Sequence, residues 1–353
     1  MDRRTFVGTL AAVSGAAAIR KGGGGQGVGA AAWLDAAPVV QRSSVRFLVT
    51  DPDYVYARPC LSPAGDRVLF ARAPATEDPV RAMNADSSPW ILCSVGLDGG
   101  RETPLFDSSD LASTRPDWSW TSNRIAFTGI ADGRADLWIL GGEGGDPVRI
   151  ELGSPARTRI FYPSWYPDGE RVAVTDYQTR QVLEVDVDGG SALPLTDPAR
   201  TWAGMSTVSP DTAAGHPLAF AGQPPDSRGW DPESNTIWLQ SPGGAPRQLD
   251  GKGGRMPAWS PGGKRLAYVS ARRRPAPTFS MHRRSVPGGL YSVFLQSVGP
   301  TLLPDGSPRA LTPFDQLALH PKWSPDGKRI ACMLQSLATG QRGIALIELD
   351  DGA

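Results

Sequence analysis

The chain has 353 residues, of which 41 are glycine and 33 are proline, so these two turn-forming residues make up about a fifth of it. Proline at close to double its ordinary frequency excludes an architecture of long helices. Hydrophobic residues still reach 40% and there are 11 tryptophans, which is enough for a folded core and argues against a disordered chain. Lysine plus arginine balances aspartate plus glutamate at 36 each, so we expect no nucleic-acid partner and no general attraction to anionic membranes.

Residues 1–32 are typical of an export signal rather than of a folded domain. Arg3 and Arg4 precede Phe6, a weakly apolar run of alanine, glycine and valine follows, and small residues at 30–32 offer a cleavage site. This segment resembles a twin-arginine signal peptide, although Asp2 replaces the serine or threonine that is commoner before the arginine pair. The apolar run is too short and too rich in small residues for a transmembrane anchor. We therefore expect residues 33–353 to be exported by the twin-arginine route and to work in the periplasm or outside the cell.

One phrase recurs along the rest of the chain. The clearest copies are RPCLSPAGDRVLF (58–70), RPDWSWTSNRIAF (115–127), YPSWYPDGERVAV (162–174), MPAWSPGGKRLAY (256–268) and HPKWSPDGKRIAC (320–332), and a degraded copy is MSTVSPDTAAGHPLAF (205–220). The second residue of each copy is a proline, or Ser206 in the degraded copy. These key prolines are 43 to 64 residues apart from one copy to the next. This period is typical of the blades of a propeller.

Each copy predicts two strands around a tight turn, because Ser-Pro-Asp-Gly favours a turn and the residues after it alternate as in a half-buried strand. A third apolar run follows every copy, at 89–95, 136–140, 182–187, 236–240, 290–296 and 344–349, and a glycine-rich turn with a short fourth strand completes most units. Six such units predict an all-β fold, a single six-bladed β-propeller of four-stranded antiparallel blades over residues 33–353. The last unit lacks its outer strand, so we expect residues 44–50 to supply it and to close the ring.

The repeated phrase also carries a family resemblance. Pro-x-Trp-Ser-Pro-Asp-Gly-x-Arg-Ile-Ala is similar to the WD-like repeat of TolB-type six-bladed propellers, which also occurs in the propellers of prolyl-oligopeptidase relatives. The resemblance covers residues 45–353 and implies the propeller fold, which hosts binding, scaffolding and catalysis alike. TolB proper has a separate N-terminal α/β domain that this sequence lacks, so we do not expect a role in the TolB envelope complex. A peptidase is not expected either, because the sequence has no hydrolase domain and no Gly-x-Ser-x-Gly nucleophile elbow.

The residue before each key proline is expected to begin the innermost strand of its blade and to line the mouth of the central channel. These residues are Arg58, Arg115, Tyr162, Met205, Met256 and His320, with Phe161 and Arg255 one step further out. Two arginines on adjacent blades, with His320 beside them in the ring, are suited to a carboxylate or phosphate, because a guanidinium group presents a fixed fork of donors. The alternative is that these arginines pair with acidic residues and plug the channel.

Three long insertions, at 72–88, 222–234 and 271–289, are expected on the same face as this ring. Trp230 lies in one of them and, with Trp202 at the entrance to the same blade, is a candidate for stacking on a ring-bearing ligand. The fifth-blade insertion carries His282 among several arginines. That cluster is suited to an anionic partner, or to pairing with the acidic residues of the neighbouring insertion.

Few residues are available for metal or disulfide chemistry. Cys60, Cys93 and Cys332 are an odd number without metal-finger spacing, so at least one is unpaired. A three-histidine centre would need all three histidines of the chain at once, and the Asp-Gly pairs lack the spacing of a calcium loop. We expect no metal site and no cofactor.

Two hypotheses for the function follow. The first is an exported, monomeric binding or scaffold protein that engages an anionic small molecule or a protein partner at the channel mouth, with Arg58, Arg115, Arg255 and Trp230 as binding residues. The second is a metal-independent lyase, hydrolase or isomerase acting on an anionic small molecule at the same face, with His320 or Tyr162 moving the proton. A solvent-accessible His320 within hydrogen-bonding reach of a carboxylate or of Tyr162 would favour the enzyme, and a ring sealed by ion pairs would favour the scaffold.

Overall fold

The computed structural model describes residues 44–75, 89–106, 111–152, 159–229, 234–250, 253–270, 291–313, 316–336 and 338–350. The predicted signal peptide at 1–32 and the predicted start of the domain at residue 33 lie outside these ranges. Within them the chain forms β-strands and turns. No helix among the described residues is long and apolar enough to cross a membrane.

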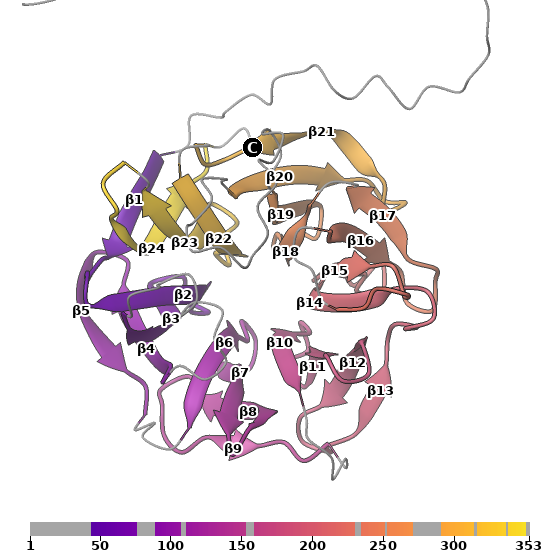
Figure 1. Ribbon diagram of the computed structural model, residues 1–353, viewed down its shortest axis with the longest axis horizontal. Coiled ribbons are helices and arrows are strands. Elements are labelled where there is room, and N and C mark those ends of the chain that lie inside the picture. Colours follow the sequence, from indigo (N-terminus) through magenta and orange to yellow (C-terminus); the bar gives the residue numbers. More distant parts are fainter. Residues whose placement is uncertain are drawn as a thin grey trace, which may run out of the picture. The chain divides into compact units, whose positions relative to one another are not determined.

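The described strands form six four-stranded antiparallel sheets, and these are the blades of a propeller arranged in a ring (Figure 1). The first three blades are β2 (Tyr54–Leu61), β3 (Arg67–Pro74), β4 (Ile91–Gly96) and β5 (Gly99–Pro104); β6 (Ala112–Trp118), β7 (Arg124–Ala131), β8 (Arg134–Gly141) and β9 (Val148–Arg149); and β10 (Ile160–Trp165), β11 (Arg171–Asp176), β12 (Gln181–Asp186) and β13 (Ala192–Pro194). The last three are β14 (Trp202–Val208), β15 (Leu218–Gln223), β16 (Thr236–Gln240) and β17 (Arg247–Asp250); β18 (Arg255–Trp259), β19 (Arg265–Ser270), β20 (Ser292–Val298) and β21 (Pro304–Ala310); and β22 (Gln316–Trp323), β23 (Arg329–Ser336) and β24 (Arg342–Glu348) with β1 (Ser44–Val49). The predicted fold class is confirmed.

The N-terminal strand closes the ring, as the sequence predicts. β1 pairs antiparallel with β24, with Ser44 opposite Glu348 and Val45 opposite Ile347. The sixth blade is therefore built from both ends of the propeller sequence, which covers an edge of β24 that would otherwise be exposed. In Figure 1 the indigo β1 lies beside the yellow β24.

The repeated turn has the geometry that its residues favour. In the sixth blade Gly327 has a φ of 70°, and its backbone N–H donates to the carbonyl oxygen of Ser324 at 3.0 Å. Glycine adopts this left-handed conformation without the steric cost that a side chain brings. The turn connects the first strand of the blade to the second.

Each innermost strand carries a β-bulge at the key proline. In the first blade Ala57 pairs with Ala71 and Cys60 pairs with Leu69, so Arg58 and Pro59 together lie opposite one residue. The same two-against-one arrangement occurs in all six blades. The residue before the proline therefore lies within its strand, and the prediction that it begins the strand is wrong. Proline is tolerated here because the extra residue of a bulge is unpaired, so its missing N–H removes no ladder hydrogen bond.

The bulge gives the same backbone conformation to six residues of four different types. The residues before the key prolines, with Met205 in the degraded copy, have φ values between 52° and 57°: Arg58, Arg115, Tyr162, Met205, Met256 and His320. This left-handed region is unusual for residues other than glycine and costs roughly 1–2 kcal/mol per residue. The bulge also redirects a side chain locally, which is how the fold turns these six residues toward its axis.

The core lies between the blades, where the tryptophans of the repeat pack. Trp118, Trp165, Trp259 and Trp323 are all buried. The indole N–H of Trp323 donates to the carbonyl oxygen of Ala258 at 3.0 Å, which connects the sixth blade to the fifth. The three cysteines are also buried, and all three are free thiols.

Candidate functional site

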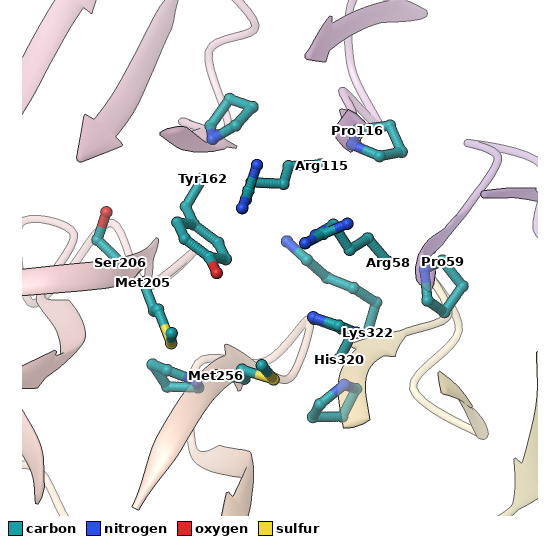
Figure 2. Close-up of a pocket in the computed structure, with 13 residues that line it drawn as sticks. Arg58, Pro59, Arg115, Pro116, Tyr162, Met205, Ser206, Met256, His320 and Lys322 are labelled. Atoms are coloured by element: carbon teal, nitrogen blue, oxygen red, sulfur yellow. The ribbon is translucent and has the colours of Figure 1, made fainter. Parts of the chain in front are cut away.

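A small pocket of about 50 Å³ lies inside the ring formed by the residues that precede the key prolines, which we call the bulge residues (Figure 2). Every blade contributes its bulge residue to the lining: Arg58, Arg115, Tyr162, Met205, Met256 and His320. Ser206, Lys322 and the five key prolines complete the wall. We call this the ring pocket. Four of the residues that the sequence nominates for a site, Arg58, Arg115, Tyr162 and His320, are thereby brought together.

The two arginines of the ring pocket are held by their neighbours. Arg58 is buried, and its guanidinium Nη1 donates to the Thr114 hydroxyl of the next blade at 2.9 Å. Its guanidinium carbon lies 5.4 Å from the centre of the Trp90 ring. The guanidinium carbon of Arg115 lies 4.4 Å and 4.9 Å from the ring centres of Phe161 and Tyr162. Such cation–π contacts restrict where the charged groups lie and so reduce the entropy lost when a ligand binds.

Lys322 is a residue of the ring pocket that the sequence analysis missed. It lies on β22, two residues after His320, and its Nζ is 2.7 Å from Asp117 Oδ1 on β6. The other carboxylate oxygen of Asp117 accepts a hydrogen bond from the backbone N–H of Trp165 at 2.8 Å. This ion pair connects the sixth blade to the second, past the first, so it lies across the channel. The signal for it is in the repeat, because the position between the proline and the tryptophan holds one acid and one base, Asp117 and Lys322.

The ion pair also borders a second cavity. Asp117 and Lys322 line this space of about 120 Å³ together with the buried tryptophans of four blades. The Lys322 side chain, which lines both spaces, therefore lies between the ring pocket and the tryptophan-lined cavity.

His320 is an electrically neutral member of the ring. Its side chain is buried, and this burial, reinforced by the positive charges of Arg58, Arg115 and Arg255, lowers its pKa well below the ordinary 6.5. Its Nδ1 is buried and has no hydrogen-bond partner among the described residues. No hydrogen bond within the described ranges joins His320 to Tyr162 or to a carboxylate. The imidazole is therefore uncharged at neutral pH, whereas the two arginines and the lysine are cations.

The other predicted binding residues lie outside this lining. Arg255 does not line the ring pocket, and its guanidinium carbon lies 3.7 Å from the centre of the Tyr291 ring. Trp230, most of 72–88 and all of 271–289 fall outside the described residues, whereas 222–229 of the remaining insertion are described. Trp90 and Tyr291 directly follow two of those insertions, and they contact Arg58 and Arg255.

The described residues offer no ready metal site. No three histidine, cysteine, aspartate or glutamate side chains within these ranges are grouped so that they could hold a metal ion. His282, one of the three histidines of the chain, is outside the described residues. The polar groups that the ring pocket presents are therefore cations, a neutral imidazole and hydroxyls.

Comparisons with known proteins bear on the fold. Neither protein-family models nor curated protein sequences give a match. Among solved structures, a putative TolB from Agrobacterium tumefaciens aligns with a TM-score of 0.57 at 18% identity, over 88% of this chain and 99% of that one. An oligogalacturonate lyase in complex with manganese aligns with a TM-score of 0.51 at 16% identity, over 91% of this chain and 96% of that one. TolB from Acinetobacter baumannii gives 0.51 at 18% identity, over 84% and 80% of the two chains. At these identities the likeness shows the fold alone, and the chain is a six-bladed β-propeller of the kind found in TolB and in oligogalacturonate lyase.

Proposed function

We propose that this propeller is a binding protein that holds an anionic ligand, or an anionic group of a protein partner, in the ring pocket. The observation that carries the proposal is the charge of the lining. Arg58, Arg115 and Lys322 lie on three neighbouring blades, and the described lining of the pocket contains no carboxylate. Guanidinium groups bind carboxylates and phosphates through paired hydrogen bonds, so the site is suited to such a group.

The surroundings of the two arginines support a binding role. Arg58 is fixed by a hydrogen bond to Thr114 and by Trp90, and Arg115 is fixed by two aromatic rings. Charged groups that are already ordered bind at a lower entropic cost than groups that must become ordered. Trp90 and Tyr291, which contact Arg58 and Arg255, lie two residues after two of the insertions, and we expect a larger partner to add its contacts there.

Binding is better supported than catalysis by His320 and Tyr162. A general base works best with a pKa close to the working pH, and the surroundings of His320 lower its pKa far from that range. Within the described residues His320 has neither a carboxylate nor Tyr162 as a hydrogen-bond partner to orient it. The proposal therefore gives His320 a role in the wall of the pocket and not in proton transfer.

Titration of the full chain with acetate and phosphate, followed by isothermal calorimetry and by the melting temperature, tests the proposal. Binding to the folded state should raise the melting temperature progressively with ligand concentration L, because the free energy of unfolding rises by RT ln(1 + L/Kd). Replacing Arg58 or Arg115 with glutamine should weaken binding on the order of tenfold or more, because a hydrogen bond to a charged group is lost. Arg200→Gln is the matched control, since Arg200 forms an exposed ion pair with Asp197 at 3.5 Å, away from the pocket. Absence of binding by both anions, or equal binding by the three variants, would refute the proposal.

We also infer that the protein is exported by the twin-arginine route and works in the periplasm or outside the cell. The support is the sequence of residues 1–32, with Arg3 and Arg4 ahead of a weakly apolar run. The test is cell fractionation of the full chain beside the Arg3→Lys, Arg4→Lys double variant. Export of the double variant at the same level as the natural sequence would contradict the inference.

A further inference from the structure

The ring pocket has two chemically different halves. The sixth blade contributes His320 and Lys322, the first blade contributes Arg58, and the second contributes Arg115. The third, fourth and fifth blades contribute Tyr162, Met205 and Met256. Figure 2 shows the nitrogen-bearing side chains grouped on one side and the tyrosine ring with the two thioethers on the other. One half of the pocket is therefore cationic and the other is largely apolar.

The apolar half offers little to a polar ligand. A thioether is only a weak hydrogen-bond acceptor and donates nothing. The side-chain oxygens that this half adds are the Tyr162 hydroxyl and the Ser206 hydroxyl, and the latter lies 3.4 Å from the hydroxyl of Thr175. The proline rings of the key positions add further apolar surface to the wall. A ligand hydroxyl placed against Met205 and Met256 would lose its hydrogen bonds to water without replacing them, which disfavours binding.

The size of the pocket limits what can enter it. A volume of about 50 Å³ is room for roughly three or four water molecules. That corresponds to a carboxylate with a short stretch of carbon chain rather than to a saccharide unit. A ligand that fits must also place its charge and its apolar part on opposite sides.

We propose that the ring pocket selects monocarboxylates with a short apolar tail, the carboxylate lying toward Arg58 and Arg115 and the tail toward Met205 and Met256. This inference rests on the proposed function and names the class of anion that the site takes. It separates this class from two others that the arginines alone would accept. Phosphate carries oxygens on every side and so would place some of them against the thioethers, and a sugar acid carries hydroxyls along its whole chain.

A ligand series on the full chain tests the selectivity. Affinities for acetate, propionate, butyrate, gluconate and phosphate are measured by isothermal calorimetry at one ionic strength. Each methylene added from acetate to butyrate should tighten binding about fourfold where it is fully buried. Butyrate has more non-hydrogen atoms than the pocket volume holds, so its last carbon lies at the mouth, and butyrate should bind between about fourfold and tenfold more tightly than acetate. Gluconate and phosphate should bind more weakly than butyrate.

Two variants of one residue test where the tail lies. Met256→Gln keeps the length of the side chain but makes it polar, and it should reduce the ratio of butyrate to acetate affinity to less than about threefold. Met256→Leu, which nearly conserves volume and polarity, should retain most of that ratio. Met205→Gln provides the same measurement on the neighbouring blade if the first variant does not fold, and tryptophan fluorescence checks the fold of each.

The outcomes separate this inference from the proposed function. Binding of acetate and phosphate that depends on Arg58 and Arg115, without a gain from acetate to butyrate, would overturn the selectivity and leave an anion site. A butyrate-to-acetate ratio that survives Met256→Gln and Met205→Gln would place the tail elsewhere and also overturn it. No binding by any member of the series would overturn both.

Discussion

Replacing His320 with glutamine should make the propeller less sensitive to mild acid. Burial and the charges of Arg58, Arg115 and Arg255 lower the pKa of this histidine well below 6.5 in the folded protein. In the unfolded chain the same imidazole takes up a proton near pH 6.5. Below that pH the unfolded state therefore binds more protons than the folded state, and the free energy of unfolding falls as the pH falls toward the folded pKa.

The size of the effect follows from the pKa of the unfolded histidine. If His320 remains neutral in the fold, its protonation in the unfolded state costs about 1.4 kcal/mol of stability at pH 5.5 and almost nothing at pH 7.5. The free energy of unfolding of the natural sequence minus that of His320→Gln should therefore decrease by about 1.4 kcal/mol between these two pH values. The titration of all other groups is common to both proteins and cancels in this difference.

Urea unfolding, followed by tryptophan fluorescence at pH 7.5 and pH 5.5, measures the difference directly. Met205→Leu is the control, because Met205 occupies the same ring position with a φ of 52° and carries no titratable group. Its effect on stability should be equal at the two pH values. If the His320→Gln difference is also equal at both, or changes in the opposite direction, then the fold does not lower the pKa of His320 and our description of the ring pocket is wrong.

Two further predictions concern the channel and the closure of the ring. Lys322→Gln should cost about 2–3 kcal/mol of stability, because the Asp117 carboxylate, only 14% exposed, loses its cation. Combined with Asp117→Asn it should cost less than the sum of the two single changes in urea unfolding, and strict additivity would show that the pair is not coupled. Deleting residues 44–49 should abolish the cooperative thermal transition, since β24 loses its partner strand. An unchanged melting temperature of the deletion variant would contradict closure by β1.

The sequence predicts the strands of this fold well because the phrase is repeated. An isolated run such as 236–240 is too short to be assigned reliably by its own pattern, but its place after a Ser-Pro-Asp turn identifies it, and the structure has β16 at Thr236–Gln240. The same repetition shows that the last unit lacks a strand, from which the role of β1 follows. Repetition thus supplies information that single-strand propensity does not contain.

The inner-strand bulge is where the sequence prediction goes wrong. A proline usually marks the beginning of a strand or its edge, so Pro59 and Pro321 suggest that the strands begin beside them. Bulges admit proline in the interior of a strand, and the pairing on both sides of Pro59 shows that the ladder continues past it. Whether a proline starts a strand or occupies a bulge depends on the partner strand, which cannot be seen in the local sequence.

The contacts of the ring pocket are hidden from the sequence for a related reason. Lys322 and Asp117 are 205 residues apart and lie on blades that are not adjacent, so their pairing depends on the diameter of the channel. Trp90, whose ring lies 5.4 Å from the guanidinium carbon of Arg58, is outside the repeated phrase, so no pattern in the sequence pairs the two. The sequence can place one residue of each blade at the ring, whereas the neighbours of that residue are set by the packing of the blades.

The strained backbone of the ring shows which part of the site belongs to the fold and which to function. Left-handed backbone at a residue other than glycine is often a mark of a functional site. Here it occurs in every blade with nearly the same φ, at arginine, tyrosine, methionine and histidine alike. A cost of roughly 1–2 kcal/mol that is repeated six times regardless of side chain is a property of the bulged inner strand, because a single functional residue would need it only once. What varies from blade to blade is the side chain that the bulge presents, and we therefore propose that the specificity of the pocket lies in the division into Arg58 and Arg115 on one side and Met205 and Met256 on the other.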